Sequence, residues 1–292
     1  MKGKIIKAHR GIYYVDIGDH IISCKARGLF REMELKPVVG DDVDIRISEE
    51  DGSGYIEKIY SRKNTLLRPI VSNVDQALIV MSLKNPAINL FLLDCFLLMC
   101  EKSRVDVLIC INKSDLILQE KKKPLLEYYA ASGYSIIFTS TVTGENSEIL
   151  LDYLKGKTTV FSGPSGVGKS SLLNLLTKGK WQSKVGNISE KTKRGKHTTR
   201  HVELYKENAN TFFLDTPGFS SLDLRFFESP YEIKELYPEF IQREKFCRFN
   251  DCNHLREPGC KIKEDVSRGL ISEERYRNYE LIFQEVQSNQ RY

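Results

Sequence analysis

The chain has 292 residues, 41% hydrophobic and 28% charged, which is typical of a soluble protein with two or three domains. Its longest apolar run, Leu90 to Cys100, is too short to cross a bilayer, and Met1-Lys2-Gly3-Lys4 does not open a signal peptide. Membrane-spanning and secreted classes are thereby excluded, so we expect a cytoplasmic protein with no membrane partner. The net charge of +5 is concentrated in residues 161–222, where 10 basic and 4 acidic side chains indicate a polyanionic partner, RNA before a membrane surface.

Residues 1–65 alternate short strand-like runs with turn signals and contain no long helical pattern. The predicted strands are Gly3–Ala8, Ile12–Ile17, His20–Lys25, Val43–Ile47 and Tyr55–Tyr60. Five short strands favour a small β-barrel, with an OB-fold as the first expectation and an SH3-like barrel as the alternative. Some basic and aromatic side chains here are candidates for a nucleic-acid groove, although the aromatic ones fit a barrel core equally well: Tyr13, Tyr14, Lys25, Arg27, Phe30 and Arg31.

From residue 66 the pattern changes to the alternating strands and helices of an α/β domain. Buried strands over Ala77–Leu83 and Val105–Ile111 enclose a helix over Asn89–Lys102. The second strand ends in the N-K-x-D motif Asn112-Lys113-Ser114-Asp115. This position is the edge at which open α/β sheets bind ligands, so the motif predicts a ligand site there.

The N-K-x-D motif predicts selection of guanine. The Asp115 carboxylate can accept hydrogen bonds from guanine N1–H and from its N2 amine, whereas adenine offers neither donor. A further strand over Tyr134–Thr139 leads to Ser140 and Thr141, which lie where a loop would back the guanine ring. Their position, rather than their residue type, makes them candidate binding residues.

The most specific pattern in the chain is the strand Thr158–Ser162 followed by a glycine-rich turn and a helix. The sequence G-x-x-x-x-G-K-S is the phosphate-binding P-loop, and the alternative is a chance glycine-rich turn. The backbone of the loop and the helix N-terminus are predicted to bind phosphate, Lys169 to reach the β- and γ-phosphates, and Ser170 to bind Mg²⁺. The predicted binding residues are Gly163, Pro164, Ser165, Gly166, Val167, Gly168, Lys169, Ser170 and Ser171.

A long basic stretch follows, from Lys178 to Arg200. It occupies the position of the GTPase segment that γ-phosphate and Mg²⁺ order, with a mobile basic loop as the alternative. Thr198 or Thr199 is predicted to supply a hydroxyl to Mg²⁺. His197 is a candidate catalytic residue that would orient the attacking water, and the alternative is that it only contacts RNA or solvent.

A D-x-x-G motif follows a predicted hairpin over residues 202–214. Asp215 is predicted to hold a water of Mg²⁺, and the Gly218 N–H to meet the γ-phosphate. Many GTPases have a water-orienting glutamine at the next position. Here that residue is Phe219, whose ring cannot orient a water, so the free protein is expected to hydrolyse slowly.

The C-terminal region contains three cysteines and a histidine within a short segment: Cys247, Cys252, His254 and Cys260. A Cys₃His set is a closed structural zinc site that leaves no position open for chemistry. A disulfide fits poorly because no secretion signal is present. We therefore predict one structural Zn²⁺ and a surrounding helical domain, with a last helix from about Ser272 to Gln287.

In ordinary GTPases the P-loop precedes D-x-x-G and N-K-x-D, whereas here N-K-S-D at 112–115 comes first, which indicates a circular permutation. The chain resembles, over its whole length, the ribosome small-subunit-dependent GTPase A family of bacterial assembly factors. The matching motifs are N-K-S-D, G-P-S-G-V-G-K-S-S, G-K-H-T-T, D-T-P-G-F and C-x₄-C-x-H-x₅-C. The resemblance implies binding to the small ribosomal subunit late in its maturation and GTP hydrolysis stimulated by that subunit.

These features predict three domains: an OB-fold at 1–65, a circularly permuted α/β P-loop GTPase at 66–222, and a mostly helical zinc-binding domain at 223–292. The expected function is hydrolysis of GTP to GDP and phosphate by a Mg²⁺-dependent monomer that binds rRNA and is released on hydrolysis. A nucleotide-gated RNA-binding scaffold is one alternative. A P-loop kinase is another, although the N-K-S-D motif argues against it.

Overall fold

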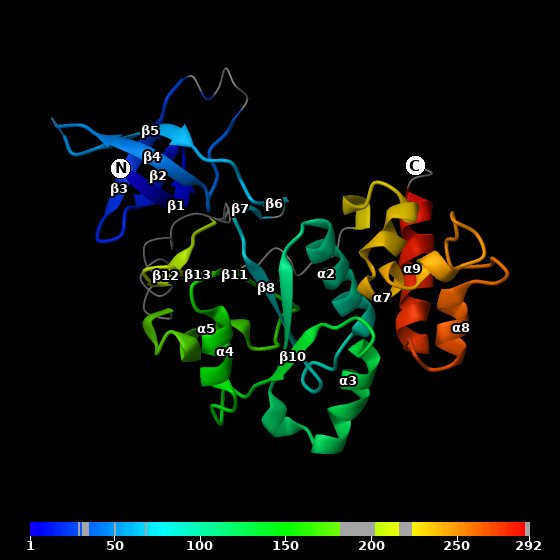
Figure 1. The fold of residues 1–292 in the computed structure, drawn as a ribbon. Coiled ribbons are helices and arrows are strands. Elements are labelled where there is room, and N and C mark those ends of the chain that lie inside the picture. The colour runs from blue at the N-terminus through cyan, green and yellow to red at the C-terminus, as the bar shows by residue number, and fades with distance from the viewer. Residues whose placement is uncertain are drawn as a thin grey trace. The chain divides into compact units, whose positions relative to one another are not determined.

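The computed structural model describes residues 1–28, 30, 35–49, 51–67, 69–181, 202–215 and 224–289 (Figure 1). Its contacts divide the chain into two compact units, which are described separately below. Unit 1 comprises Met1–Leu78, Ser147–Ser162 and Lys169–Phe219, and unit 2 comprises Ile79–Asn146, Gly163–Gly168 and Ser220–Tyr292. None of the helices in the described ranges is long and apolar enough to cross a membrane.

Unit 1 begins with a closed barrel of strand order β1-β2-β3-β5-β4, coloured blue in Figure 1. Its strands are β1 (Lys2–His9), β2 (Ile12–Asp16), β3 (Ile21–Ala26), β4 (Asp42–Ile47) and β5 (Gly54–Ile59). Strands β3 and β5 are parallel, and the other neighbours are antiparallel. Ile5, Val15 and Val43 point into the barrel and are fully buried. The predicted OB-fold is confirmed.

The residues proposed as a nucleic-acid groove differ in their burial in the structure. Tyr13 and Phe30 are each only 7% exposed and belong to the core, so the groove prediction is wrong for them. The reason is the two-residue period of a strand, which places Tyr13 on the same inner face as Val15. Arg27 is exposed and pairs with Glu57 at 2.9 Å.

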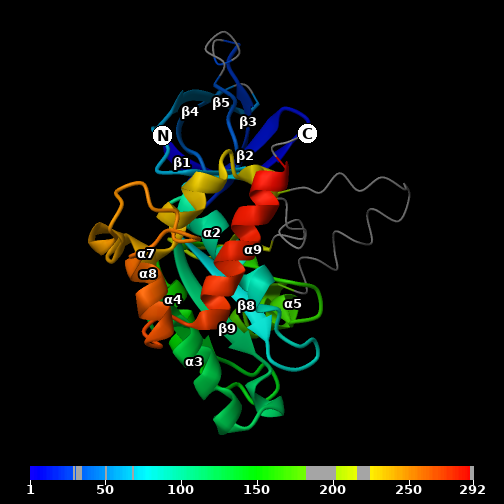
Figure 2. The same cartoon turned by 90° about the vertical axis from the view of Figure 1, so that its right-hand side faces the viewer.

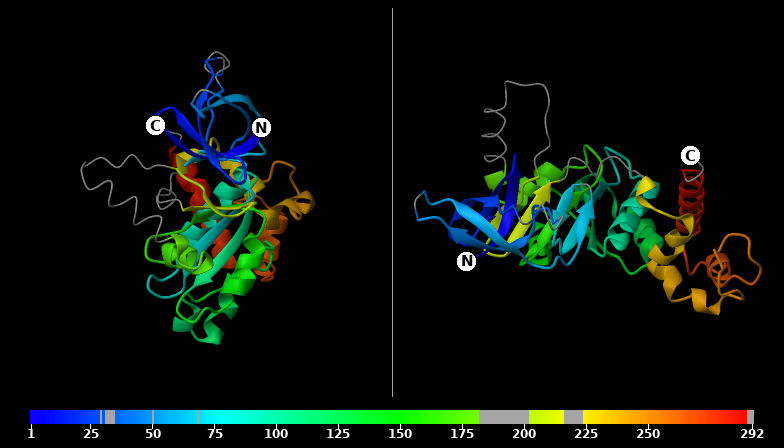
Figure 3. Two further views of the ribbon diagram at one scale, coloured as in Figure 1. Left: turned by 90° about the vertical axis from the view of Figure 1, so that its left-hand side faces the viewer. Right: turned by 90° about the horizontal axis from the view of Figure 1, so that it is seen from above.

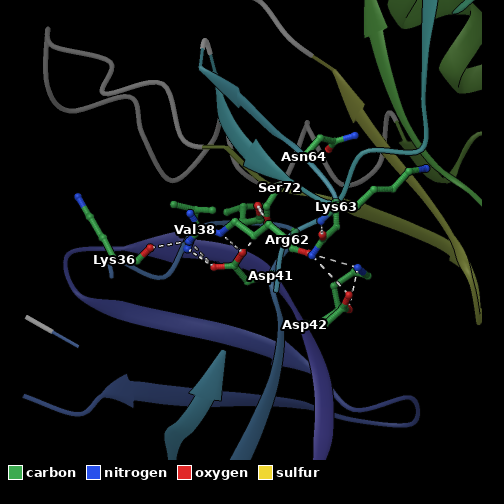
Figure 4. A network of polar contacts seen from close by, with 12 residues as sticks. Lys36, Val38, Asp41, Asp42, Arg62, Lys63, Asn64 and Ser72 are labelled. Atoms are coloured by element: carbon green, nitrogen blue, oxygen red, sulfur yellow. Dashed lines mark hydrogen bonds and ion pairs between the residues drawn. The ribbon is translucent and has the colours of Figure 1, made fainter. Parts of the chain in front are cut away.

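A buried carboxylate anchors the segment that follows the barrel (Figure 4). Asp41, 0% exposed, accepts hydrogen bonds from Arg62 Nε at 2.7 Å and Ser72 Oγ at 2.6 Å, and from the Val38 N–H at 2.8 Å. Ser72 ends β7 (Ile70–Ser72), which pairs with β6 (Thr65–Leu67). A buried charge needs such partners, so Arg62 fixes the connector to the barrel.

The central sheet has the strand order β10-β9-β8-β11-β13-β12. The boundary between the units falls within β8 (Gln76–Ser82), a strand buried along its whole length. Unit 1 contributes β11 (Thr158–Ser162), β12 (Tyr205–Asn208), β13 (Thr211–Asp215), α4 (Ser147–Leu154) and α5 (Lys169–Leu176). Strands β11 and β13 are parallel, which brings their carboxyl ends to one edge.

Unit 2 contains the parallel strands β9 (Asp106–Asn112) and β10 (Ser135–Phe138) with the helices α2 (Leu90–Lys102) and α3 (Lys123–Tyr129). Helix α2 begins where the Asn89 side chain accepts a hydrogen bond from the Leu92 N–H at 2.9 Å. It is buried on most sides, which agrees with its largely apolar sequence.

The C-terminal part of unit 2 is helical, as predicted. Its elements are η3 (Leu224–Phe226), η4 (Pro230–Leu236), α7 (Pro238–Ile241), η5 (Glu244–Phe246), α8 (Lys261–Ser267) and α9 (Glu273–Asn289). Helix α9, red in Figures 2 and 3, lies beside the yellow and orange segments of this region. Cys95 and Leu98 of α2 share one hydrophobic core with Tyr279, Ile282 and other side chains of α9. This core therefore extends from the C-terminal region to helix α2.

Candidate functional site

The P-loop approaches its neighbours so closely that two of its positions exclude any side chain. A Cβ at Gly163 would lie 2.0 Å from the Val80 carbonyl oxygen, and one at Gly168 would lie 2.4 Å from Asn112 Nδ2. Both residues also have positive φ angles, +132° and +95°, which favour glycine. The two glycines of the motif are thus required by packing as well as by backbone conformation.

The N-K-S-D motif holds the P-loop directly. Asn112, 1% exposed, donates from Nδ2 to the Val167 carbonyl oxygen at 2.8 Å. Lys113 donates from Nζ to the Gly166 carbonyl oxygen at 2.7 Å and also binds the Asn85 carbonyl oxygen. From the sequence, Asn112 and Lys113 were predicted only as members of the GTP-binding motif, and this contact with a loop more than fifty residues away was missed. The only signal for it was their shared place at the edge of the sheet.

Asp115 is exposed at the same edge, and Ser140 orients its carboxylate. The Ser140 hydroxyl donates to Asp115 Oδ1 at 2.5 Å and accepts from the Val142 and Thr143 N–H groups at 3.2 and 3.1 Å. Ser140 itself is 0% exposed. Its hydroxyl therefore faces the aspartate, and Thr141 is the more exposed member of the predicted pair.

In unit 1, three predicted phosphate and Mg²⁺ residues lie together. Ser170 Oγ and Asp215 Oδ2 are 3.5 Å apart, although 45 positions separate them in the sequence. Burial raises the pKa of Asp215, while Lys169 and Ser170 act in the opposite direction. Burial likewise lowers the pKa of Lys169, against the influence of Asp215. A hydroxyl and a carboxylate this close are the hard oxygen donors that Mg²⁺ prefers.

The remaining predicted site residues differ in accessibility. Ser165, Gly166, Ser170 and Ser171 are exposed, whereas Val167 is buried. His197, Thr198, Thr199, Gly218 and Phe219 lie outside the described residues. Their roles stay predictions.

The cysteine and histidine side chains predicted to bind zinc converge in the C-terminal region. Their ligand atoms all lie within 4.8 Å of one another. His254 Nδ1 faces Cys247 Sγ at 3.6 Å and Cys260 Sγ at 3.5 Å. Burial lowers the pKa of His254 to about 4, so its ring is neutral, and burial raises the pKa of Cys252 to about 12. Soft sulfur and imidazole donors in a closed set fit Zn²⁺, which would hold the thiols as thiolates.

The surroundings of this cluster also fit a metal site. His254 Nε2 is buried and has no hydrogen-bond partner among the described residues, while Glu244 Oε2 lies 3.9 Å from it. A carboxylate beside the second ring nitrogen is the usual arrangement around a metal-bound histidine. Tyr276 and Tyr279 of α9 donate to the carbonyl oxygens of His254 and Asn253 at 2.6 and 2.5 Å. Helix α9 thus fixes the backbone of the cluster.

Comparisons with known proteins agree with this architecture. The family model described as RsgA N-terminal domain matches residues 2–56, and the model described as RsgA GTPase matches residues 59–225. A curated relative from Agathobacter rectalis, "Small ribosomal subunit biogenesis GTPase RsgA", is 46% identical, with 100% of each chain covered. A protein of the same name from Clostridium acetobutylicum is 48% identical over 96% of this chain and 95% of its own.

Two solved structures match nearly the whole chain. YjeQ from Thermotoga maritima has a TM-score of 0.84 and 38% identity, with 98% of each chain covered. YloQ, described as a circularly permuted GTPase, has a TM-score of 0.82 and 35% identity over 99% of this chain and 95% of its own. The predicted permutation is confirmed, and this chain belongs to the RsgA GTPase family.

Proposed function

We propose that this protein hydrolyses GTP during late maturation of the small ribosomal subunit, binds ribosomal RNA and is released when GTP is cleaved. The observation that carries the proposal is the contact of Asn112 and Lys113 with the P-loop beside the exposed Asp115. It joins a guanine-selective group to a phosphate-binding loop. The small ribosomal subunit enters the proposal from the names of the full-length relatives.

The proposal keeps the three domains at 1–65, 66–222 and 223–292. The N-terminal family model ends at residue 56 and the GTPase model begins at residue 59, which supports a boundary after the barrel. The metal-binding cluster supports a distinct role for the last region, where we place one structural Zn²⁺ on Cys247, Cys252, His254 and Cys260. The protein acts as a cytoplasmic monomer in this proposal.

Nucleotide binding in this proposal divides between base and phosphates. Asp115 accepts from guanine N1–H and N2, with Ser140 holding the carboxylate and Thr141 beside the ring. The P-loop N–H groups of residues 163–171 and the Lys169 ammonium bind the phosphates. GDP is retained through the same contacts, apart from those to the γ-phosphate.

In the hydrolytic step, a water attacks the γ-phosphorus and GDP leaves with the bridging oxygen. Ser170, Asp215 and either Thr198 or Thr199 would hold Mg²⁺, which when bound offsets the charge of the phosphates. The Gly218 N–H donates to the γ-phosphate, and His197 orients the water. RNA contacts with the basic residues between Lys178 and Arg200 order the loop that carries His197.

Turnover measured with purified ribosomal subunits tests the proposal. GTP hydrolysis by the full chain should be slow alone and should rise with small subunits but not with large ones. Binding to small subunits without any rise in turnover would favour the nucleotide-gated scaffold. Transfer of phosphate to a nucleoside monophosphate would instead identify a kinase.

Exchange of Asp115 for asparagine should change the preferred base. The amide can donate to the C2 oxygen of xanthine but cannot accept from both guanine donors, so a preference for XTP over GTP of at least about 100-fold is expected. Competition binding with GTP, XTP and ATP measures this change. Wild-type protein that binds ATP as well as GTP would refute guanine selection.

Exchange of His197 for alanine should remove most of the turnover that small subunits stimulate, roughly a 100-fold loss typical of a missing acid–base group. GTP affinity and subunit binding should be retained. Lys193→Ala, in the same basic stretch, is the control. It should weaken binding to the small subunit, and any loss of stimulated turnover should match that loss of binding. Full stimulated turnover in the His197 variant would exclude His197 as the catalytic group.

A further inference from the structure

Glu145 lies beside the guanine motif and has no role in the site described so far. Its side chain, 37% exposed, accepts a hydrogen bond from the hydroxyl of Ser114, the residue that precedes Asp115. The same carboxylate pairs with Lys122 Nζ at 3.4 Å. Glu145 and Ser114 are 31 positions apart in the sequence, so the contact joins two separate loops of unit 2.

Of the two side-chain contacts of Glu145, the hydrogen bond to Ser114 is the stronger one. Ser114 is only 4% exposed, and a buried hydroxyl without a partner is destabilising. The pair with Lys122 is partly exposed, and such ion pairs contribute little alone. A hydrogen bond to an ionised acceptor is stronger than one between neutral groups, so Glu145 holds Ser114 more firmly than an amide would.

The backbone of Glu145 reaches the other neighbour of Asp115. The Ser140 N–H donates to the Glu145 carbonyl oxygen at 3.3 Å, and the Gly144 N–H donates to the Ser140 carbonyl oxygen at 2.9 Å. Ser140 in turn donates through its hydroxyl to Asp115 Oδ1. Glu145 therefore holds Asp115 from two directions, through Ser114 by its side chain and through Ser140 by its backbone.

We propose that Glu145 is a positioning residue for guanine recognition, because its hydrogen bond to Ser114 sets the orientation of the Asp115 carboxylate. The proposal rests on the guanine site proposed above. Two simultaneous hydrogen bonds to N1–H and the N2 amine require both oxygens of Asp115 to lie in the plane of the base, and a rotation at Ser114 would lose one of them. Glu145 therefore affects mainly the hydrogen bond between Asp115 and the N2 amine of guanine.

Binding of GDP and IDP to the full chain tests this role, because hypoxanthine lacks only the N2 amine of guanine. Glu145→Ala should weaken GDP binding about tenfold, the loss expected for one hydrogen bond to a charged group. IDP binding should change less, so the GDP-to-IDP ratio should fall. Glu145→Gln keeps an acceptor oxygen and should restore most of the ratio. Glu148→Ala, which removes an exposed carboxylate from the first turn of α4, should behave as wild type.

A double-mutant cycle with Ser114→Ala separates positioning from a general effect on folding. Ser114→Ala should reproduce the loss, and the double variant should lose no more than either single variant. Equal weakening of GDP and IDP by Glu145→Ala, or unchanged affinities, would overturn the proposal. If Glu145→Ala unfolds, Ser114→Ala alone provides the same test, because it removes the other partner of this hydrogen bond and leaves the Glu145 carboxylate in place. Wild-type protein without a preference for GDP over ADP would refute the guanine site itself instead.

Discussion

Replacement of Arg275 by methionine is expected to lower the free energy of unfolding by about 3–5 kcal/mol. Arg275 is 1% exposed and lies between two buried carboxylates. Its Nη1 is 2.5 Å from Asp94 Oδ1, and its Nε donates to Glu239. Methionine would leave both acids in the core without their cation, which is far costlier than the loss of an exposed ion pair.

The neighbours of Asp94 predict how this loss depends on pH. Tyr128, Tyr129 and Asn278 donate to its oxygens at 2.7, 2.8 and 2.8 Å, yet burial still raises the pKa of Asp94 against these bonds and against Arg275. Without Arg275 the pKa rises further. The folded variant then keeps a proton that the unfolded chain releases, so its stability should fall as pH rises through the aspartate range toward neutrality.

Urea unfolding of the full chain, measured at neutral and at mildly acidic pH, checks this prediction. Arg277→Met is the matched control, since Arg277 is exposed on the same helix and its replacement should change stability by no more than about 0.5 kcal/mol. Asp94→Asn combined with Arg275→Met should recover part of the loss. A change below about 1 kcal/mol for Arg275→Met at neutral pH would show that the cluster is not charged.

Loss of the proposed Zn²⁺, by chelation or by Cys252→Ala, is expected to have the larger effect, because structural zinc contributes on the order of 10 kcal/mol to folding in small domains. The cluster and α9 are connected through Tyr276 and Tyr279, so the helix should lose its support with the metal. Since Cys95 and Leu98 of α2 belong to the same core, the effect should extend beyond the C-terminal region.

Hydrogen exchange before and after chelation measures this spread. Exchange should increase over residues 224–289 and also over α2, while the barrel strands stay protected. Cys24→Ala is the control, because Cys24 is a buried barrel residue outside the metal cluster and its loss should leave the zinc content unchanged. Full zinc occupancy and unchanged exchange in Cys252→Ala would refute the structural role of the metal.

Much of the fold followed from local chemistry in the chain. The five barrel strands were predicted within a few residues because alternating apolar residues and glycine turns determine them over short distances. The P-loop and the Cys₃His cluster that could hold a metal were also evident, since the spacing of each motif indicates its chemistry. The sequence left groove and core open for Tyr13 and Phe30, and both are core residues. Tyr13 lies in β2 and Phe30 between β3 and β4, and in neither place does an aromatic residue type show whether it faces the core or the solvent.

The sequence by itself therefore determined the motifs, their permuted order and the four Cys and His residues that lie together and could hold a metal ion. Only the tertiary structure decided that Asn112 and Lys113 hold the P-loop and that Glu145 reaches Ser114. It also paired Asp94 with Arg275, 181 positions away, where the sequence showed only a charge within an apolar helix. The physical reason is that such contacts depend on how distant elements pack. The residues near a polar side chain in the sequence do not identify its partner in the fold.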